Sequence, residues 1–87
     1  MFYVVYNKEN NVVLQWQNDQ SVGVPFLTAE QYRDRYAKEK SIDADSVDVI
    51  IMPVPEVLPT PHSNIINTQT LTFSPNLNYQ PPVSSSN

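Results

Sequence analysis

The chain has 87 residues and a formal net charge of −4, with only five Lys and Arg residues and no cysteine. A chain of this length forms at most one small domain, and with so few cations to neutralise phosphate we expect no nucleic-acid partner. The lack of cysteine excludes disulfides, thiolate nucleophiles and Cys-rich zinc sites. Nowhere do about 18 apolar residues run together, and the N-terminal residues lack the basic region of a signal peptide. We therefore expect no membrane partner and a cytoplasmic location unless the chain is part of a virion.

Two stretches near the N-terminus predict a β-hairpin. Residues 2–6 are aromatic or β-branched, and residues 12–17 alternate so that one face holds Val12, Leu14 and Trp16. Three of the five residues between these stretches are asparagines, which tolerate the left-handed backbone of hairpin loops.

A helix is predicted over residues 29–40. Thr28 and Gln31 have the spacing of a capping box. Leu27 and Tyr32 stand where a hydrophobic staple would lie. The apolar stripe of this helix is narrow, so we expect it to cover one face of a small sheet.

A third strand is predicted over residues 47–52, which gives the element order β-β-α-β. If this strand lies beside the first, the sheet has the order 2-1-3, is antiparallel throughout and carries the helix on one face. We therefore expect an α+β fold, with a small ββαβ module over residues 1–52.

The composition changes sharply at Pro53. All five Lys and Arg residues lie before residue 41, whereas past Met52 only Glu56 is charged and seven of the eight prolines are found. No helical or long strand period links the apolar residues of this last third into one surface. We therefore expect residues 53–87 to form a long extended arm that takes its shape from a partner.

Strand alternation over residues 68–73 indicates how such an arm could bind. A strand added to the open edge of a partner sheet gains main-chain hydrogen bonds, and flanking prolines that hold the chain extended reduce the entropy lost on docking. The side chains expected to anchor the arm on protein partners are Ile65, Ile66, Leu71, Phe73, Leu77 and Tyr79.

Few residues suggest chemistry. His62, the sole histidine, lies in the expected arm, away from a rigid scaffold that would orient a catalytic base. Asp43, Asp45 and Asp48 resemble the start of a calcium loop but lack its central glycine and final glutamate, so we expect them to solvate the helix exit and cap the loop. We expect no enzyme, no cofactor and no metal site.

A compact module followed by an uncharged arm rich in Pro, Thr and Asn resembles small virion proteins of tailed bacteriophages. These are, in particular, capsid decoration or cement proteins and minor head-tail components. The resemblance is carried by the stretch Pro53-Val54-Pro55-Glu56-Val57-Leu58-Pro59-Thr60-Pro61, by residues 65–75 and by the cysteine-free, acidic composition. It implies a multi-copy protein on a capsid shell whose arm crosses onto adjacent subunits.

Two function classes remain open at this point. The first is a non-enzymatic structural protein that staples neighbouring subunits of a larger assembly, with a phage particle as the leading candidate. The second is a small acidic inhibitor or antitoxin-like regulator that wraps one soluble target with the same arm. High copy number in a particle favours the first, and one-to-one copurification with a cytosolic protein favours the second. A flexible tail without a partner is the remaining alternative.

Overall fold

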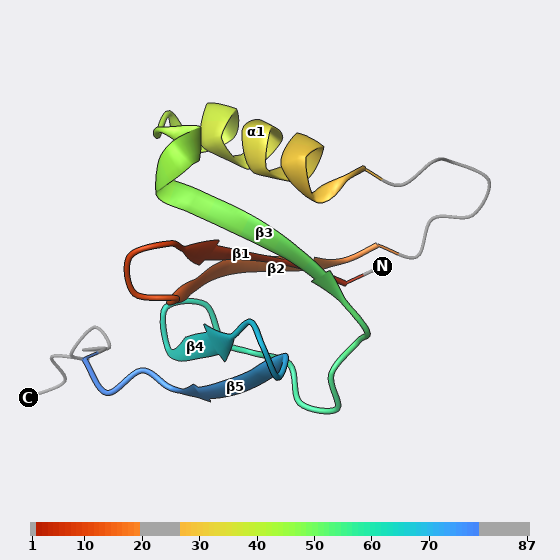
Figure 1. The fold of residues 1–87 in the computed structure, drawn as a ribbon, viewed down its shortest axis with the longest axis vertical. Helices are drawn as coiled ribbons and strands as arrows, with labels where there is room; N and C mark the ends of the chain where they lie inside the picture. The colour runs from red at the N-terminus through yellow and green to blue at the C-terminus, as the bar shows by residue number, and fades with distance from the viewer. Residues whose placement is uncertain (1, 20–26, 79–87) are drawn as a thin grey trace, which may run out of the picture.

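A three-stranded antiparallel sheet forms the centre of the protein (Figure 1). The computed structural model describes residues 2–19 and 27–78. β1 (Phe2–Asn7) lies between β2 (Val13–Asn18) and β3 (Val47–Met52), and it pairs antiparallel with both. The predicted strand order 2-1-3 and the α+β class are confirmed.

The helix α1 (Ala29–Lys40) has the predicted bounds and the predicted capping box. The Thr28 hydroxyl oxygen accepts a hydrogen bond from the Gln31 amide at 3.1 Å, and the Gln31 side chain accepts one from the Thr28 amide at 3.0 Å. These bonds satisfy two backbone donors that the first turn of a helix leaves free. The helix ends at Ser41, which adopts the left-handed conformation, and a short 3-10 turn, η1 (Ala44–Ser46), leads into β3.

The helix packs on one face of the sheet around two tyrosines. The rings of Tyr3 and Tyr32 stack with their centroids 4.7 Å apart and their planes 7° from parallel. The Tyr3 hydroxyl also donates to the Leu27 carbonyl at 2.8 Å, which fixes the chain just before the helix. The buried residues of this layer are Tyr3, Val5, Tyr32, Tyr36, Val47 and Val49.

The last third of the chain folds back instead of extending. β4 (Asn64–Asn67) and β5 (Thr72–Pro75) form an antiparallel hairpin that lies across the sheet from α1 (Figure 1). The prediction of a long extended arm is therefore wrong for the part of it that the structure describes, residues 53–78. The strand alternation predicted over residues 68–73 is also wrong in part: residues 68–71 form a turn, and only Thr72 and Phe73 lie in β5, which pairs with β4 of the same chain.

Ile66 explains why the hairpin folds back. Its side chain is 0% exposed and packs in a second core layer on the sheet face opposite the helix. The buried residues of this layer are Phe2, Val4, Val13, Met52 and Ile66, and the half-buried Leu71 and Phe73 pack against them. The domain division at Pro53 stays a prediction, and this core layer contains residues from both sides of it.

The sequence of β1 shows why a second core layer is needed. Residues 2–5 are all buried, with Phe2 and Val4 in the layer under the hairpin and Tyr3 and Val5 in the layer under the helix. A run of apolar residues without alternation is typical of a strand covered on both faces. One helix covers only one face, so the other face requires the hairpin.

A β-bulge breaks the alternation of β2. The register with β1 shifts by one residue at Leu14. Val13 and Trp16 consequently pack in the layer under the hairpin, whereas Leu14 packs on the helix side. The prediction that Val12, Leu14 and Trp16 share one face is wrong, because the extra residue of a bulge changes which side chains point to each face.

We expect the substitution Ile66→Ala to lower the free energy of unfolding by about 2–5 kcal/mol, because it leaves a cavity in the second core layer. Urea denaturation followed by circular dichroism measures the loss. The matched control is Leu77→Ala, at a side chain that is 92% exposed, which should change stability by less than about 0.5 kcal/mol. Equal midpoints for the two variants would show that the hairpin does not cover the sheet.

Candidate interaction surface

The chain between β3 and β4 presents apolar side chains to solvent. Val54, Val57 and Leu58 are 51%, 79% and 47% exposed. Ile42 and Leu77 are the other large hydrophobic residues that are exposed within the described ranges. Exposed apolar residues scattered singly are ordinary, but three within five positions mark a candidate contact surface.

An open hollow of about 410 Å³ lies between this segment and the β4-β5 hairpin. We call this space the apolar hollow, and its apolar lining comes from Pro55, Val57, Leu58, Pro59, Leu71 and Phe73. Glu56, Asn64 and Thr72 complete the lining, so only one charged residue borders it. The lining combines residues from two segments that only the folded chain brings together.

The segment that borders the apolar hollow is fixed to the sheet at its far end. The indole Nε1 of Trp16 donates to the carbonyl of the buried Pro59 at 2.8 Å, and the Trp16 ring stacks on Phe2 with centroids 5.3 Å apart. Three residues later, the His62 amide donates to the Val13 carbonyl of β2 at 2.6 Å. A segment held in this way loses little conformational entropy when a partner binds it.

Leu71 reaches the apolar hollow from a strained backbone position. Its φ is 56°, in the left-handed region that costs a residue with a Cβ about 1–2 kcal/mol. The turn around it explains why this conformation persists, since the Leu71 amide donates to the Asn67 carbonyl at 2.8 Å and the Asn67 side chain accepts from the Gln69 and Thr70 amides. The turn thus holds the half-buried Leu71 side chain in the lining of the hollow.

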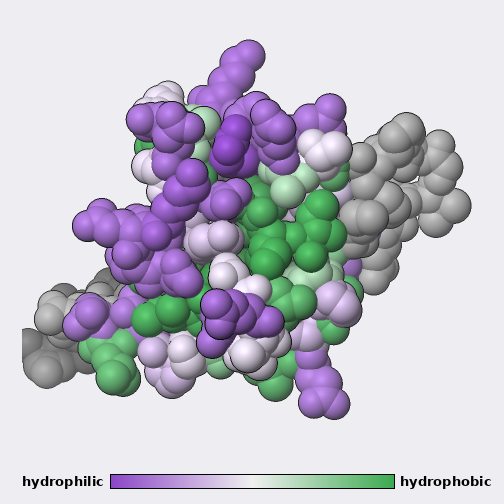
Figure 2. Space-filling view, viewed as in Figure 1, coloured by the Kyte–Doolittle hydropathy of each residue, from purple (hydrophilic) through white to green (hydrophobic). Residues whose placement is uncertain are grey.

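Apolar surface continues from this segment toward the sheet. Figure 2 shows a patch of apolar residues over β3, below the polar surface of α1. The half-buried β3 residues Ile50 and Ile51 pack on opposite faces of the sheet, the first on the hairpin side and the second on the helix side. The edge strand and the segment that follows it therefore form one largely apolar side of the molecule.

Three of the six predicted anchor residues have accessible side chains near the C-terminal end of the described chain. Leu71 and Phe73 are half-buried and line the apolar hollow. Leu77 is 92% exposed, the most exposed large hydrophobic residue described. Their role in partner binding stays a prediction.

The other three predicted anchors lie elsewhere. Ile66 is buried in this chain's own core, so its side chain is not available to a partner, and the prediction does not fit it. Ile65 is half-buried and lines a separate open hollow rimmed by asparagines. Tyr79 lies outside the described residues.

The sequence analysis did not single out Val54, Val57 and Leu58 as site residues. The available signal was the alternation of apolar residues with Pro53, Pro55 and Pro59. Prolines restrict the backbone, and the apolar residues between them do not repeat with the period of a helix or strand that would face a core. What could not be foreseen was the tryptophan that holds the segment in place, since Trp16 and Pro59 are far apart in the chain.

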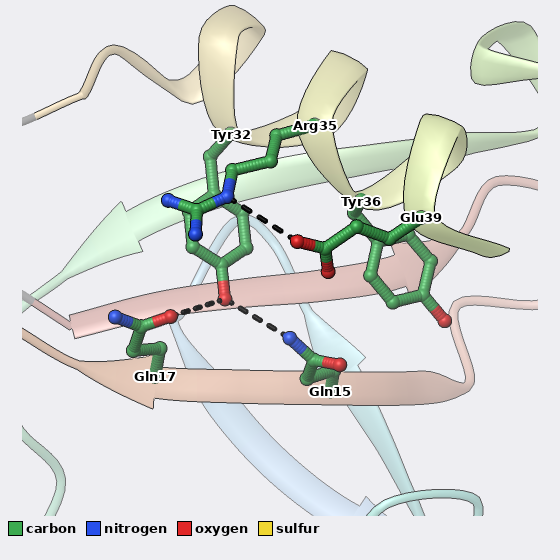
Figure 3. A pocket seen from close by; sticks show the side chains of 6 residues that line it. All are labelled: Gln15, Gln17, Tyr32, Arg35, Tyr36 and Glu39. Atoms are coloured by element: carbon green, nitrogen blue, oxygen red, sulfur yellow. Dashed lines mark hydrogen bonds and ion pairs between the residues drawn. The ribbon is translucent and has the colours of Figure 1, made fainter.

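A smaller hollow between α1 and β2 is too small for an organic substrate (Figure 3). Its volume is about 50 Å³, and Gln15, Gln17, Tyr32, Arg35, Tyr36 and Glu39 line it. The Tyr32 hydroxyl accepts from the Gln15 side chain at 3.2 Å and donates to the Gln17 side chain at 3.1 Å. Arg35 pairs with Glu39 at 3.4 Å on the helix surface. The polar side chains that line this hollow are thus largely hydrogen-bonded or ion-paired with one another.

Tyr3 and Tyr36 of the helix layer are not activated as nucleophiles or bases. Burial, then the charge of Asp19 and the neighbouring Tyr32, raises the pKa of Tyr3 above its ordinary value of 10.0. Burial and Tyr32 likewise raise the pKa of Tyr36. A phenol with a raised pKa stays protonated at neutral pH and is a poor nucleophile or base.

The remaining candidates for chemistry are placed as follows. His62 is exposed on the connection before β4, with φ at 67°. The Asp43 carboxylate accepts from the Asp45 amide at 3.0 Å at the start of η1, which confirms the loop-capping role predicted for it. Within residues 2–19 and 27–78, no group of three or more His, Cys, Asp or Glu side chains is arranged to hold a metal ion. In the same ranges, no helix is long and apolar enough to cross a membrane.

No protein-family model, no curated protein and no solved structure matches this chain.

Trp16→Phe tests the attachment of the segment. The variant keeps an aromatic ring beside Phe2 but removes the donor to the Pro59 carbonyl, which leaves a buried acceptor without its partner. We expect a loss of about 1–3 kcal/mol of unfolding free energy, measured by urea denaturation. In NMR spectra, the amide signals of residues 56–58 should shift more than those of α1. Unchanged signals in that segment would contradict the attachment.

The raised pKa values of Tyr3 and Tyr36 predict a loss of stability at alkaline pH. Above pH 10.0 the unfolded tyrosines release protons first, so the folded state binds more protons and the free energy of unfolding falls as pH rises. Urea titrations at a series of pH values, together with the ultraviolet absorbance of tyrosinate, measure this. Tyrosines that all ionise near pH 10.0 in the folded protein would contradict it.

Proposed function

We propose that this protein is a non-enzymatic structural interaction protein that binds protein subunits of a larger assembly through the apolar hollow and the neighbouring Val54. The observation that carries the proposal is the exposure of Val54, Val57 and Leu58 on a segment attached to the sheet by Trp16. Unfavourable apolar exposure on a restrained segment is typical of a surface that a partner covers.

The size of this surface limits how strongly one contact can bind. Full burial of one apolar side chain contributes roughly 1.5–3 kcal/mol, so three contribute on the order of 5–9 kcal/mol. Association costs an amount of similar size in lost translational and rotational freedom. A single such contact is therefore weak, and strong incorporation into an assembly requires that each copy contact more than one subunit.

A virion of a tailed bacteriophage is the assembly that we propose, as a capsid decoration, cement or minor head-tail protein. The stretch that carries the resemblance to such proteins, residues 53–61, includes the exposed segment. The mechanism differs from the one expected from the sequence, because the partner would bind a folded surface and not order a long arm. A single glutamate, Glu56, borders the hollow, which favours an apolar protein partner over a phosphate-bearing one.

The test compares Val57→Asp with Ile42→Asp in the organism or phage that encodes the protein. Both substitutions add one carboxylate at an exposed apolar position, but only Val57 lines the apolar hollow. We expect Val57→Asp to reduce the amount of protein in purified particles by about tenfold or more, since a desolvated carboxylate at an interface centre costs well over 1 kcal/mol. Mass spectrometry of particles against cytosol measures the amount.

Two results would overturn the proposal. One is equal incorporation of Val57→Asp and Ile42→Asp; the other is a wild-type protein found only in the cytosol in a one-to-one complex, which would favour the inhibitor class. Point variants are preferable to removal of residues 53–87, because that truncation also removes the core residue Ile66.

A further inference from the structure

The two edges of the sheet are covered differently. At the β2 edge, the Val13 carbonyl accepts from the His62 amide, the Asn11 carbonyl accepts from the Ile66 amide, and Val12 forms a bridge with Ile65. At the β3 edge, no described strand pairs with the outer side. An open edge of this kind offers its amides and carbonyls to any other strand.

The hydrogen-bond register identifies which groups of β3 face outward. The Lys8 amide donates to the Ser46 carbonyl at 3.2 Å, so this pair directs its backbone groups between β1 and β3. In an antiparallel pair the inward and outward residues alternate. Asp48, Ile50 and Met52 therefore bond to β1, whereas Val49 and Ile51 direct their amides and carbonyls to the open edge.

One outward amide is already occupied, by a side chain of the same strand. The Asp48 carboxylate accepts a hydrogen bond from the Val49 amide at 2.8 Å. The carboxylate also interacts with Tyr6, directly opposite on β1, and after burial this contact is what raises the pKa of the Tyr6 hydroxyl. Two bonds thus fix Asp48 at the middle of the edge.

We propose that the outer edge of β3 is a strand-pairing site that Asp48 keeps closed, and that the occupant it excludes is a second copy of this chain. The role is separate from the proposed function, because the apolar hollow lies on the segment after β3. Asp48 is the only charged residue in an otherwise apolar strand. A six-residue apolar edge strand without a charge is a typical site of self-association.

A second copy fits this edge well apart from Asp48. In the symmetric antiparallel register centred on Val49, that residue pairs with its own copy and Val47 pairs with Ile51, so the helix side gains only apolar pairs. The central hydrogen bonds of this register use the Val49 amide, which Asp48 occupies. Asp48 would then have to leave that amide and face Ile50 of the second copy.

In a second copy, no cation of β3 itself would lie opposite the displaced carboxylate; the cation whose charge reaches Asp48 is Arg33, on α1 of the same chain. All five Lys and Arg residues lie before residue 41, so neither β3 nor the residues that follow it supply one. The symmetric register centred on Asp48 itself places two carboxylates directly opposite each other, which is unfavourable. Asp48 therefore opposes both central registers, by occupying the amide in one and by like charge in the other.

The test is the oligomeric state of Asp48→Ala, measured by sedimentation velocity over a range of protein concentrations. We expect its dimer dissociation constant to fall by about tenfold or more relative to the wild type, because the Val49 amide is freed and the charge that a dimer would have to bury is removed. The matched control is Asp45→Ala, which makes the same change in net charge away from the β3 edge and should behave as the wild type.

The double variant Asp48→Ala with Ile51→Pro tests whether the new contact uses this edge. Proline removes an outward amide, which an edge strand tolerates, so the double variant should return to the wild-type dissociation constant. The proposal is overturned if folded Asp48→Ala sediments as Asp45→Ala does, or if its association survives Ile51→Pro.

Hydrogen exchange of the wild-type protein gives a second readout that needs no variant. The Val49 amide, bonded to Asp48, should exchange more slowly than the outward Ile51 amide. This measurement decides the matter if Asp48→Ala fails to fold. Equal exchange rates at the two amides would show that Asp48 does not close the edge.

Discussion

The central strand β1 must be buried on both of its faces, and the rest of the structure follows from that requirement. Four consecutive apolar residues, 2–5, leave no polar face to turn toward water. The helix α1 covers the face that carries Tyr3, and the stacked Tyr32 together with the Tyr3 hydroxyl bond fixes its position. The opposite face needs a second cover. The β4-β5 hairpin, with Ile66 fully buried, is that cover.

Folding back of the hairpin changes which residues are available for function. It removes Ile66 from the surface, and it converts residues 53–63 from a free arm into a connection attached at Trp16 and Val13. The apolar residues between the prolines of that connection pack into neither core layer, so Val54, Val57 and Leu58 stay exposed. The same event that completes the core thus creates the apolar hollow, because it places Leu71 and Phe73 beside Val57 and Leu58. Stability and the candidate interaction surface share one physical origin.

The two edges of the sheet show how a small core is closed by different means. At β2, the connection and the first residues of β4 supply backbone partners, and they can do so because the hairpin passes under that edge. At β3, a single carboxylate occupies the middle amide. Asp48 costs little there, since its oxygens remain near solvent and bond to Val49 and Tyr6. The apolar side of the molecule visible in Figure 2 lies next to this edge, where the Asp48 side chain occupies the Val49 amide.

The sequence by itself determined the local elements: the capping box at Thr28 and Gln31 predicted the helix to its bounds, and the β-branched runs predicted three strands in the order found. These features depend on neighbours within a few positions, so they can be recognised without knowing the fold. The bulge at Leu14, the burial of Ile66 and the hydrogen bond between Trp16 and Pro59 were decided only by the tertiary structure. Each of these features joins groups far apart in the chain or depends on a shift in register. An apolar residue such as Ile66 has the same local sequence pattern whether it packs against another protein or against the sheet of its own chain.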